Sequence, residues 1–175
     1  MIEDKLRSLI RDVPDFPEPG VLFKDITPVL GDAQVLTEII EAIADPYREQ
    51  GITKVAGIES RGFILATPVA MALGAGFVPL RKPGKLPYEV VREEYSLEYG
   101  TDALEMHVDA VDPDDRVLIV DDVIATGGTA AAAAKLLHRP GAEIVGMIVM
   151  VELGFLNGRA ALNGLPLNAL VTYGD

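Results

Sequence analysis

Two adjacent aspartates and two adjacent glycines lie in one short stretch of the chain, VLIVDDVIATGGTA, which runs from Val117 to Ala130. Its first four residues are apolar and predict a strand buried on both faces of a parallel sheet, and residues 130–137 predict a helix. The loop between them would lie at the carboxyl edge of the sheet. Glycine there adopts conformations closed to other residues and lets backbone N–H groups approach an anion, while the helix N-terminus adds partial positive charge. The stretch therefore predicts a phosphate-binding loop.

Two well-known phosphate loops do not match this stretch. A Walker loop needs lysine and then serine or threonine after its last glycine, whereas Gly128 is followed by Thr129 and Ala130. The dinucleotide fingerprint G-x-G-x-x-G is missing from the sequence as well. Asp121 and Asp122 would repel a phosphate, but they can accept hydrogen bonds from sugar hydroxyls. A ribose 5-phosphate offers both groups, and the alternative is an acidic turn followed by a helix cap.

With its strand, acid pair and ATGGT loop, the segment resembles the phosphoribosyl-diphosphate loop of the type I phosphoribosyltransferases. Four further segments resemble the adenine phosphoribosyltransferase family in order and spacing: DFPEPGVLFKDITPVL, AGIESRGF, LRKPGKLP and YSLEYG. The resemblance covers the chain from about Asp15 to Leu162. It implies an α/β protein with the type I phosphoribosyltransferase fold, in which helices flank a five-stranded parallel sheet. It also implies an N-terminal hood that carries base specificity and a flexible flap.

Composition limits the fold class and the location of the protein. With 175 residues, 49% of them hydrophobic, the chain is long enough for one packed domain and too short for two. We expect the hood at about residues 1–33, mainly from Asp15 to Asp32, and the flap at about residues 81–106. The absence of cysteine and the presence of only His107 and His138 leave no ordinary zinc site. The sequence has no membrane-length apolar run and no signal-peptide core, so we expect a cytoplasmic protein.

The formal net charge of −12 argues against nucleic acids and anionic membranes as partners. An anionic substrate then needs local cations. Arg81, Lys82 and Lys85 form a basic cluster, and Arg61 lies in a second turn of small residues, where a diphosphate could be bound. The alternative for the cluster is a solvated loop.

The order of the predicted elements is typical of an α/β fold. Apolar residues from Ile2 to Val13 recur at helical spacing and predict a helix that stops at Pro14. The remaining predicted helices cover residues 34–49, the segment from the Ser60 turn to about residue 73, and residues 130–137. The predicted strands cover residues 54–58, 77–80, 117–120, 143–151 and 167–171. The segment 81–106 interrupts this alternation and is predicted to project. The Ser60 turn, the Arg81 cluster and the Asp121 loop each follow a strand, so they should meet at one edge of the sheet.

The resemblance implies transfer of the 5-phosphoribosyl group from 5-phosphoribosyl 1-diphosphate to adenine, which gives AMP and diphosphate. Breaking the anomeric C–O bond builds positive charge on the ribose, and Asp121 and Asp122 are placed to stabilise it. Mg²⁺ should neutralise the departing diphosphate, held mainly by substrate oxygens because the sequence shows no carboxylate cage. Relatives are commonly homodimers. The alternatives are transfer to another purine, such as xanthine or hypoxanthine, and a non-catalytic regulator that binds the sugar diphosphate.

The resemblance also implies a role for individual residues. The catalytic residues would be Glu98, Asp121, Asp122 and Arg61. The 5-phosphate would be bound by Ala125, Thr126, Gly127, Gly128 and Thr129. The diphosphate would be bound by Ser60, Arg61, Gly62, Arg81, Lys82 and Lys85, with a cis peptide between Glu59 and Ser60. Adenine would be bound by Phe23, Lys24, Arg61 and Tyr99.

Glu98 has the most specific predicted role of these residues. Relatives that act on 6-oxopurines use an aspartate at the position of Ala125 to share a proton at N7 of the purine. Since this chain has alanine there, Glu98 in its SLEYG context is the better candidate for that role. Tyr95, Leu97 and Tyr99 would share one face of the flap strand and Glu98 would take the other. The alternative is a solvated glutamate on a strand.

Overall fold

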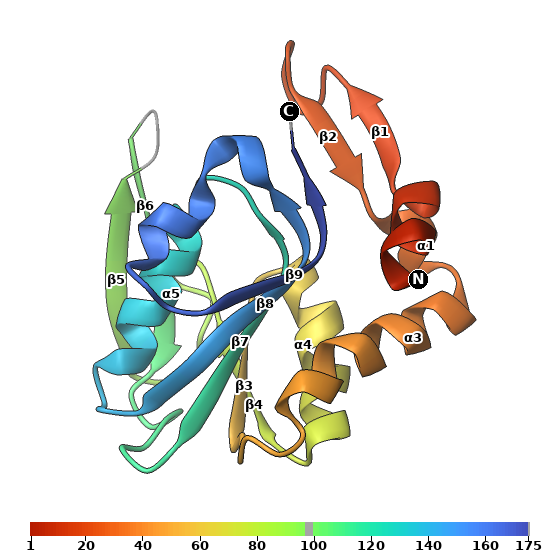
Figure 1. The fold of residues 1–175 in the computed structure, drawn as a ribbon. Coiled ribbons are helices and arrows are strands. Elements are labelled where there is room, and N and C mark those ends of the chain that lie inside the picture. The colour runs from red at the N-terminus through yellow and green to blue at the C-terminus, as the bar shows by residue number, and fades with distance from the viewer. Residues whose placement is uncertain (97–99, 175) are drawn as a thin grey trace.

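The computed structural model describes residues 1–96 and 100–174 (Figure 1). Within these residues, the central sheet has five parallel strands in the order β4-β3-β7-β8-β9. The strands are β3 (Lys54–Ile58), β4 (Gly76–Leu80), β7 (Arg116–Ile124), β8 (Glu143–Leu153) and β9 (Leu167–Tyr173). The fold class and the five-stranded sheet predicted from the sequence are thereby confirmed.

Helices cover both faces of the sheet (Figure 1). The α-helices are α1 (Ile2–Leu9), α2 (Thr27–Leu30), α3 (Ala33–Ala44), α4 (Arg61–Leu73) and α5 (Gly128–His138). Short 3-10 helices are η1 (Asp45–Tyr47), η2 (Gly154–Leu156) and η3 (Gly158–Leu162). Among the residues the structure describes, no helix is both long and apolar enough to cross a membrane.

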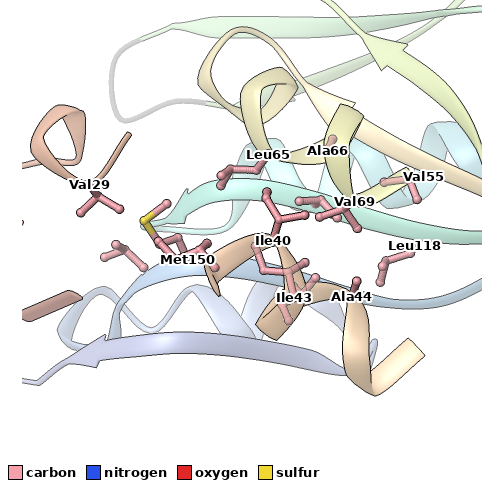
Figure 2. Packing of buried hydrophobic residues seen from close by; sticks show 14 of the residues in the cluster. Val29, Ile40, Ile43, Ala44, Val55, Leu65, Ala66, Val69, Leu118 and Met150 are labelled. Carbon is pink, nitrogen blue, oxygen red and sulfur yellow. The ribbon is translucent and has the colours of Figure 1, made fainter. Parts of the chain in front are cut away.

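The hydrophobic core has two layers because β7 is buried on both faces. Leu118 of β7 packs with Ile43 of α3 and Val69 of α4 on one face (Figure 2). Ile119 points to the other face, where it packs with the cluster that includes Leu136 of α5. All five side chains are fully buried. The continuous apolar run at residues 117–120 therefore has the two-sided burial that the sequence predicted.

Two helices end earlier than the sequence predicted. Residues 11–14 form β1 (Arg11–Pro14), which pairs antiparallel with β2 (Leu22–Asp25), so the first helix stops at Leu9. Pairing with β2 supplies backbone hydrogen bonds that a further helical turn would otherwise have made. The helix predicted over 34–49 ends at Ala44 and passes into η1. Its start is well defined, because the Asp32 carboxylate caps it by accepting the N–H groups of Gln34 and Val35, each at 3.0 Å.

The segment 81–106 contains a second antiparallel hairpin, formed by β5 (Val90–Ser96) and β6 (Thr101–His107). We expected it to project, but its described residues lie along α5 (Figure 1). Val91 and Tyr95 pack against the core layer that contains α5. The Glu93 carboxylate pairs with Arg139 at 2.5 Å and with Lys135 at 3.7 Å. The strand predicted through Tyr95 is confirmed as far as Ser96, and Leu97, Glu98 and Tyr99 lie outside the described residues.

Candidate active site at the carboxyl edge of the sheet

The turns that follow β3 and β7 enclose a cavity of about 420 Å³. The two strands are neighbours in the sheet, and β4 lies on the other side of β3. The residues that line the cavity are Ile58, Glu59, Ser60, Arg61, Lys82 and the continuous stretch 121–130. The structure thus brings together the three segments that we expected to meet at one edge. The peptide between Glu59 and Ser60 is cis, as the resemblance implied.

The loop after β7 leads directly into the first turn of α5. β7 continues past both aspartates to Ile124, so the connection is shorter than the sequence suggested. Within the part of the chain that the structure describes, no side chain caps the N-terminus of α5, and its first residues, Gly128, Thr129 and Ala130, line the cavity. The backbone N–H groups of a helix's first turn have no intrahelical partner, and together with the helix dipole they suit a bound anion.

Gly127 is the residue of this loop that must be glycine. Its φ is +83°, and a Cβ there would lie 2.3 Å from the carbonyl oxygen of Gly158 and 2.9 Å from the Cβ of Ala161. The expectation of an unusual backbone is wrong for Gly128, whose φ is not positive. The nearest atom to a Cβ at Gly128 is Tyr95 Cδ2 at 3.6 Å, an ordinary contact. The shape of the phosphate loop therefore depends on Gly127 and on its packing against η3.

The two aspartates have different surroundings. Asp122 is 5% exposed, and its Oδ2 accepts a hydrogen bond from Arg61 Nε at 2.5 Å. Asp121 Oδ1 accepts the backbone N–H of Asp122 at 2.9 Å. Burial, and next the neighbouring Asp122 carboxylate, raise the pKa of Asp121 well above its ordinary value. A Cβ on Gly62 would lie 2.6 Å from Asp121 Oδ1, so glycine at this position makes room for the Asp121 carboxyl group.

Arg61 connects the acid pair to the N-terminal hairpin formed by β1 and β2. Its guanidinium carbon lies 5.3 Å from the ring centroid of Phe23, which belongs to β2. Phe16 packs edge-on against Phe23, with ring centroids 5.1 Å apart. A planar cation and an aromatic ring therefore lie together beside the cavity, an arrangement that suits a flat heterocycle.

Lys24 follows Phe23 on β2, and its side chain has other partners. Lys24 Nζ donates to Asp12 Oδ1 at 2.5 Å and lies 4.1 Å from the ring centroid of Tyr173. Of the residues predicted to bind adenine, the structure brings Phe23 and Arg61 together and leaves the Lys24 side chain apart. Tyr99 lies outside the described residues.

Lys82 is the cation that reaches the cavity from the segment after β4. Its ammonium donates to Tyr95 Oη at 2.7 Å and pairs with Asp102, so it is held by the second hairpin. Burial acts to lower the pKa of Lys82, but hydrogen bonds to Asp102 and Tyr95 outweigh it and raise that pKa above its ordinary value. The Lys82 backbone N–H donates to Glu59 Oε1 at 2.5 Å, which connects the turns after β3 and β4.

Arg81 and Lys85 do not line the cavity. Arg81 Nε lies 3.4 Å from Glu59 Oε1, and the guanidinium carbon lies 5.9 Å from the ring centroid of Phe63 on α4. Arg81 also donates to the Lys85 carbonyl at 3.3 Å. The predicted basic cluster is therefore divided: Lys82 faces the cavity, whereas Arg81 lies over α4.

Several residues that organise the site were missed at the level of sequence. Glu59, Tyr95 and Asp102 hold Lys82, as described above. Glu105 of β6 is 7% exposed, accepts the Gly84 N–H at 3.0 Å, and pairs through its backbone with Arg81. A weak signal was present, since Glu105 interrupts the apolar run ALEM in a segment otherwise taken as a polar flap. No cluster of three or more His, Cys, Asp or Glu side chains suited to a metal ion is found in residues 1–96 and 100–174.

Known proteins share this architecture and sequence. A family model described as "Phosphoribosyl transferase domain" matches residues 30–154. The adenine phosphoribosyltransferase of Anaeromyxobacter dehalogenans (strain 2CP-1) is 56% identical over 170 residues, which covers 97% of this chain and 99% of that protein. The crystal structure of adenine phosphoribosyltransferase from Rhodothermus marinus superposes with a TM-score of 0.94 at 56% identity and covers 98% of both chains.

A third similar protein is the adenine phosphoribosyltransferase of Saccharomyces cerevisiae, with a TM-score of 0.92 at 38% identity. It covers 97% of this chain and 98% of its own. That protein was crystallised with D-2,5-dideoxy-2,5-imino-altritol 1,6-bisphosphate and adenine.

Proposed function

The chain belongs to the adenine phosphoribosyltransferase family, and from this premise we propose that it makes AMP in purine salvage. It would transfer the 5-phosphoribosyl group of 5-phosphoribosyl 1-diphosphate to adenine and release diphosphate. The observation that carries this proposal is the cavity itself. It combines the N-terminus of α5, which has no side-chain cap among the described residues, with two adjacent carboxylates. It is also lined by Arg61, whose guanidinium lies over the ring of Phe23. These features match a phosphate, a ribose and a purine base respectively.

The 5-phosphate would be bound by residues 125–129 at the start of α5. Backbone N–H groups would donate to its oxygens, and the helix dipole would favour its charge. Gly127 would shape the loop, and the Thr126 and Thr129 hydroxyls are available as further donors. This is the role predicted for the loop from the sequence.

The acid pair would bind the ribose and stabilise the transition state. Asp121 and Asp122 would accept hydrogen bonds from the 2′ and 3′ hydroxyls of the sugar. As the anomeric C–O bond to diphosphate breaks and the bond to adenine N9 forms, the ribose gains positive charge and the fixed carboxylates stabilise it. Arg61 would orient Asp122 and, with Phe23, hold the base in line for attack. Glu98 would share a proton at N7, a role that rests on the sequence resemblance.

The diphosphate would lie against the turn Ser60 to Gly62 and against Lys82. Lys82 would exchange its partners Asp102 and Tyr95 for diphosphate oxygens. Mg²⁺ would neutralise charge on the leaving diphosphate. From the sequence we expect substrate oxygens and water to supply most of its ligands, and the Asp121 carboxylate at the cavity would supply one more.

We propose that the protein is a homodimer and that it carries out this reaction in the cytoplasm. The outer face of α4 leaves Ile64 45% exposed and Met71 78% exposed, which suits burial against a second copy. A cytoplasmic location is supported by the substrate, because a sugar carrying three phosphates is too strongly charged to cross a bilayer and must be used in the compartment that makes it.

The activity can be tested with purified protein, Mg²⁺, 5-phosphoribosyl 1-diphosphate and each of adenine, hypoxanthine, guanine, xanthine and orotate. We expect AMP to form from adenine at least about tenfold faster than any other nucleotide, since discrimination between bases by buried hydrogen bonds is commonly this strong. Dominant turnover of another base would contradict the assignment to adenine. Binding of 5-phosphoribosyl 1-diphosphate without turnover of any base would favour the alternative that the protein is a non-catalytic regulator.

A further inference from the structure

A buried carboxylate does not belong to the site described above, although its residue pairs in the sheet with Ile124, which lines the cavity. Glu152 lies near the end of β8, is 5% exposed, and faces Arg159 of η3. Arg159 Nε donates to Glu152 Oε1 at 2.6 Å and Nη2 donates to Oε2 at 2.8 Å, so both oxygens are engaged by one guanidinium. Arg159 Nη1 also donates to the Leu167 carbonyl at 2.6 Å, and Thr172 Oγ1 donates to Glu152 Oε2 at 3.1 Å. The pair thus fixes η3 to the ends of β8 and β9.

η3 in turn packs closely against the backbone of the phosphate loop, residues 125–129. A Cβ on Gly127 would lie 2.3 Å from the Gly158 carbonyl oxygen, and a Cβ on Gly158 would lie 2.4 Å from the Ala125 carbonyl oxygen. Gly158 is the residue directly before Arg159. Because Arg159 is covalently bonded to Gly158, holding Arg159 in place restricts where the Gly158 backbone can lie, and that backbone packs closely against Ala125 and Gly127.

The charge state of the pair suits a fixed support. The hydrogen bonds from Arg159 hold the pKa of Glu152 below its ordinary value, against burial, which acts to raise it. The same contact with Glu152 raises the pKa of Arg159. Both groups are thus charged across the pH range in which an enzyme works, and their two-pronged geometry is specific to arginine.

We propose that Glu152 and Arg159 are positioning residues for the 5-phosphate loop, acting through Gly158. They touch no substrate. Their effect is to hold η3 in the place where Gly127 takes its left-handed conformation and the N–H groups of α5 point into the cavity. This inference rests on the proposed function, because it assigns the 5-phosphate to residues 125–129.

The proposal predicts a loss of affinity that depends on the ligand. Arg159→Met should raise the Kd for ribose 5-phosphate about tenfold, as expected when part of a charge-assisted hydrogen-bond pair no longer orients the loop. The Kd for inorganic diphosphate with Mg²⁺ should stay within about twofold, because that ligand would lie at Ser60 to Gly62 and Lys82. In steady state the KM for 5-phosphoribosyl 1-diphosphate should rise more than kcat falls.

Two further variants keep the test independent of folding defects. Arg159→Lys keeps the positive charge but loses the paired hydrogen bonds to the two Glu152 oxygens. Gly158→Ala leaves the ion pair in place and disturbs the contact between Gly158 and Ala125 directly. Both should show the same selective loss of ribose 5-phosphate binding. Arg48→Met is the matched control, since Arg48 also pairs with carboxylates (Glu41 and Asp45) and donates to a carbonyl (Ala72), but lines no part of the cavity.

Isothermal titration and thermal unfolding of the five proteins distinguish the outcomes. Weaker binding of ribose 5-phosphate but not of diphosphate in the Arg159 and Gly158 variants, with both affinities unchanged in Arg48→Met, supports the proposal. Equally weaker binding of both ligands, or parent-like affinity for both in folded Arg159→Lys, overturns the proposal and leaves the ion pair as a purely structural contact. Failure of the parent protein to bind ribose 5-phosphate at all would instead contradict the proposed function.

Discussion

Replacing Gly127 by alanine tests whether the phosphate loop has the backbone shape described here. A non-glycine residue at φ +83° costs about 1–2 kcal/mol. The new Cβ would also lie 2.3 Å from the Gly158 carbonyl oxygen and 2.9 Å from the Ala161 Cβ, so one backbone segment must move. Relieving such an overlap in a packed region typically costs a further 1–3 kcal/mol, roughly.

These two effects together predict a destabilisation of about 2–5 kcal/mol. In a protein of this size each kcal/mol lowers Tm by about 2–4 °C, so the expected fall is about 4–20 °C. Because the movement displaces the N–H groups at the start of α5, the KM for 5-phosphoribosyl 1-diphosphate should rise by at least about tenfold.

Differential scanning calorimetry and steady-state kinetics measure the two effects. Gly128→Ala is the matched control for stability, since its φ is not positive and its new Cβ would meet nothing closer than 3.6 Å. Alanine is favoured over glycine in a helix by up to about 1 kcal/mol, so Gly128→Ala should keep or raise the parent Tm. A Gly127→Ala protein with the parent's Tm and KM would refute the assigned loop geometry.

Four further outcomes follow from the acid pair and the second hairpin. Asp122→Asn should lower kcat on the order of 10²-fold, the effect of losing about 2.7 kcal/mol of charge stabilisation in the transition state, measured by AMP formation. Asp121→Asn should raise Tm at neutral pH by an amount that vanishes in acid, because the raised pKa of Asp121 makes its ionised form cost folding free energy. Asp102→Asn should lower Tm at neutral pH by an amount that vanishes in acid. The hydrogen bond from Lys82 lowers the pKa of Asp102 below 3.8, so ionised Asp102 stabilises the fold above that pH and the stabilisation is lost below it. A Tm series from pH 7 to 2 would show this loss. Glu98→Leu should lower turnover of adenine by on the order of 10² to 10⁴-fold with the affinity for sugar diphosphate nearly unchanged, and Glu98→Gln should retain more activity, as single-turnover kinetics would show.

The fold was largely predictable because its signals are local. β3 runs from Lys54 to Ile58 as predicted, and the buried run at residues 117–120 identified the central strand. Boundaries were less predictable where pairing with a distant segment decides them. The helix predicted to continue to Pro14 ends at Leu9, because residues 11–14 pair with β2.

The candidate site was predictable where one segment carries the chemistry. Asp121, Asp122 and Gly127 could be recognised from their spacing alone, and Arg61 from the resemblance. The partners of Lys82 could not, because Tyr95 and Asp102 come from another hairpin and long-range ion pairs leave no periodic pattern in a sequence. Arg81 and Lys82 form one basic cluster in the sequence, but adjacent residues on an extended chain point in opposite directions, so only Lys82 lines the cavity.

A crystal structure with AMP bound would locate all three parts of the nucleotide at once, since one ligand carries the phosphate, the ribose and the base. We expect the phosphate at the backbone N–H groups of residues 125–129, the ribose hydroxyls at Asp121 and Asp122, and the adenine ring beside Arg61 and Phe23. A nucleotide whose phosphate binds at the turn of Ser60 to Gly62, or whose base lies away from the N-terminal hairpin, would contradict this expectation.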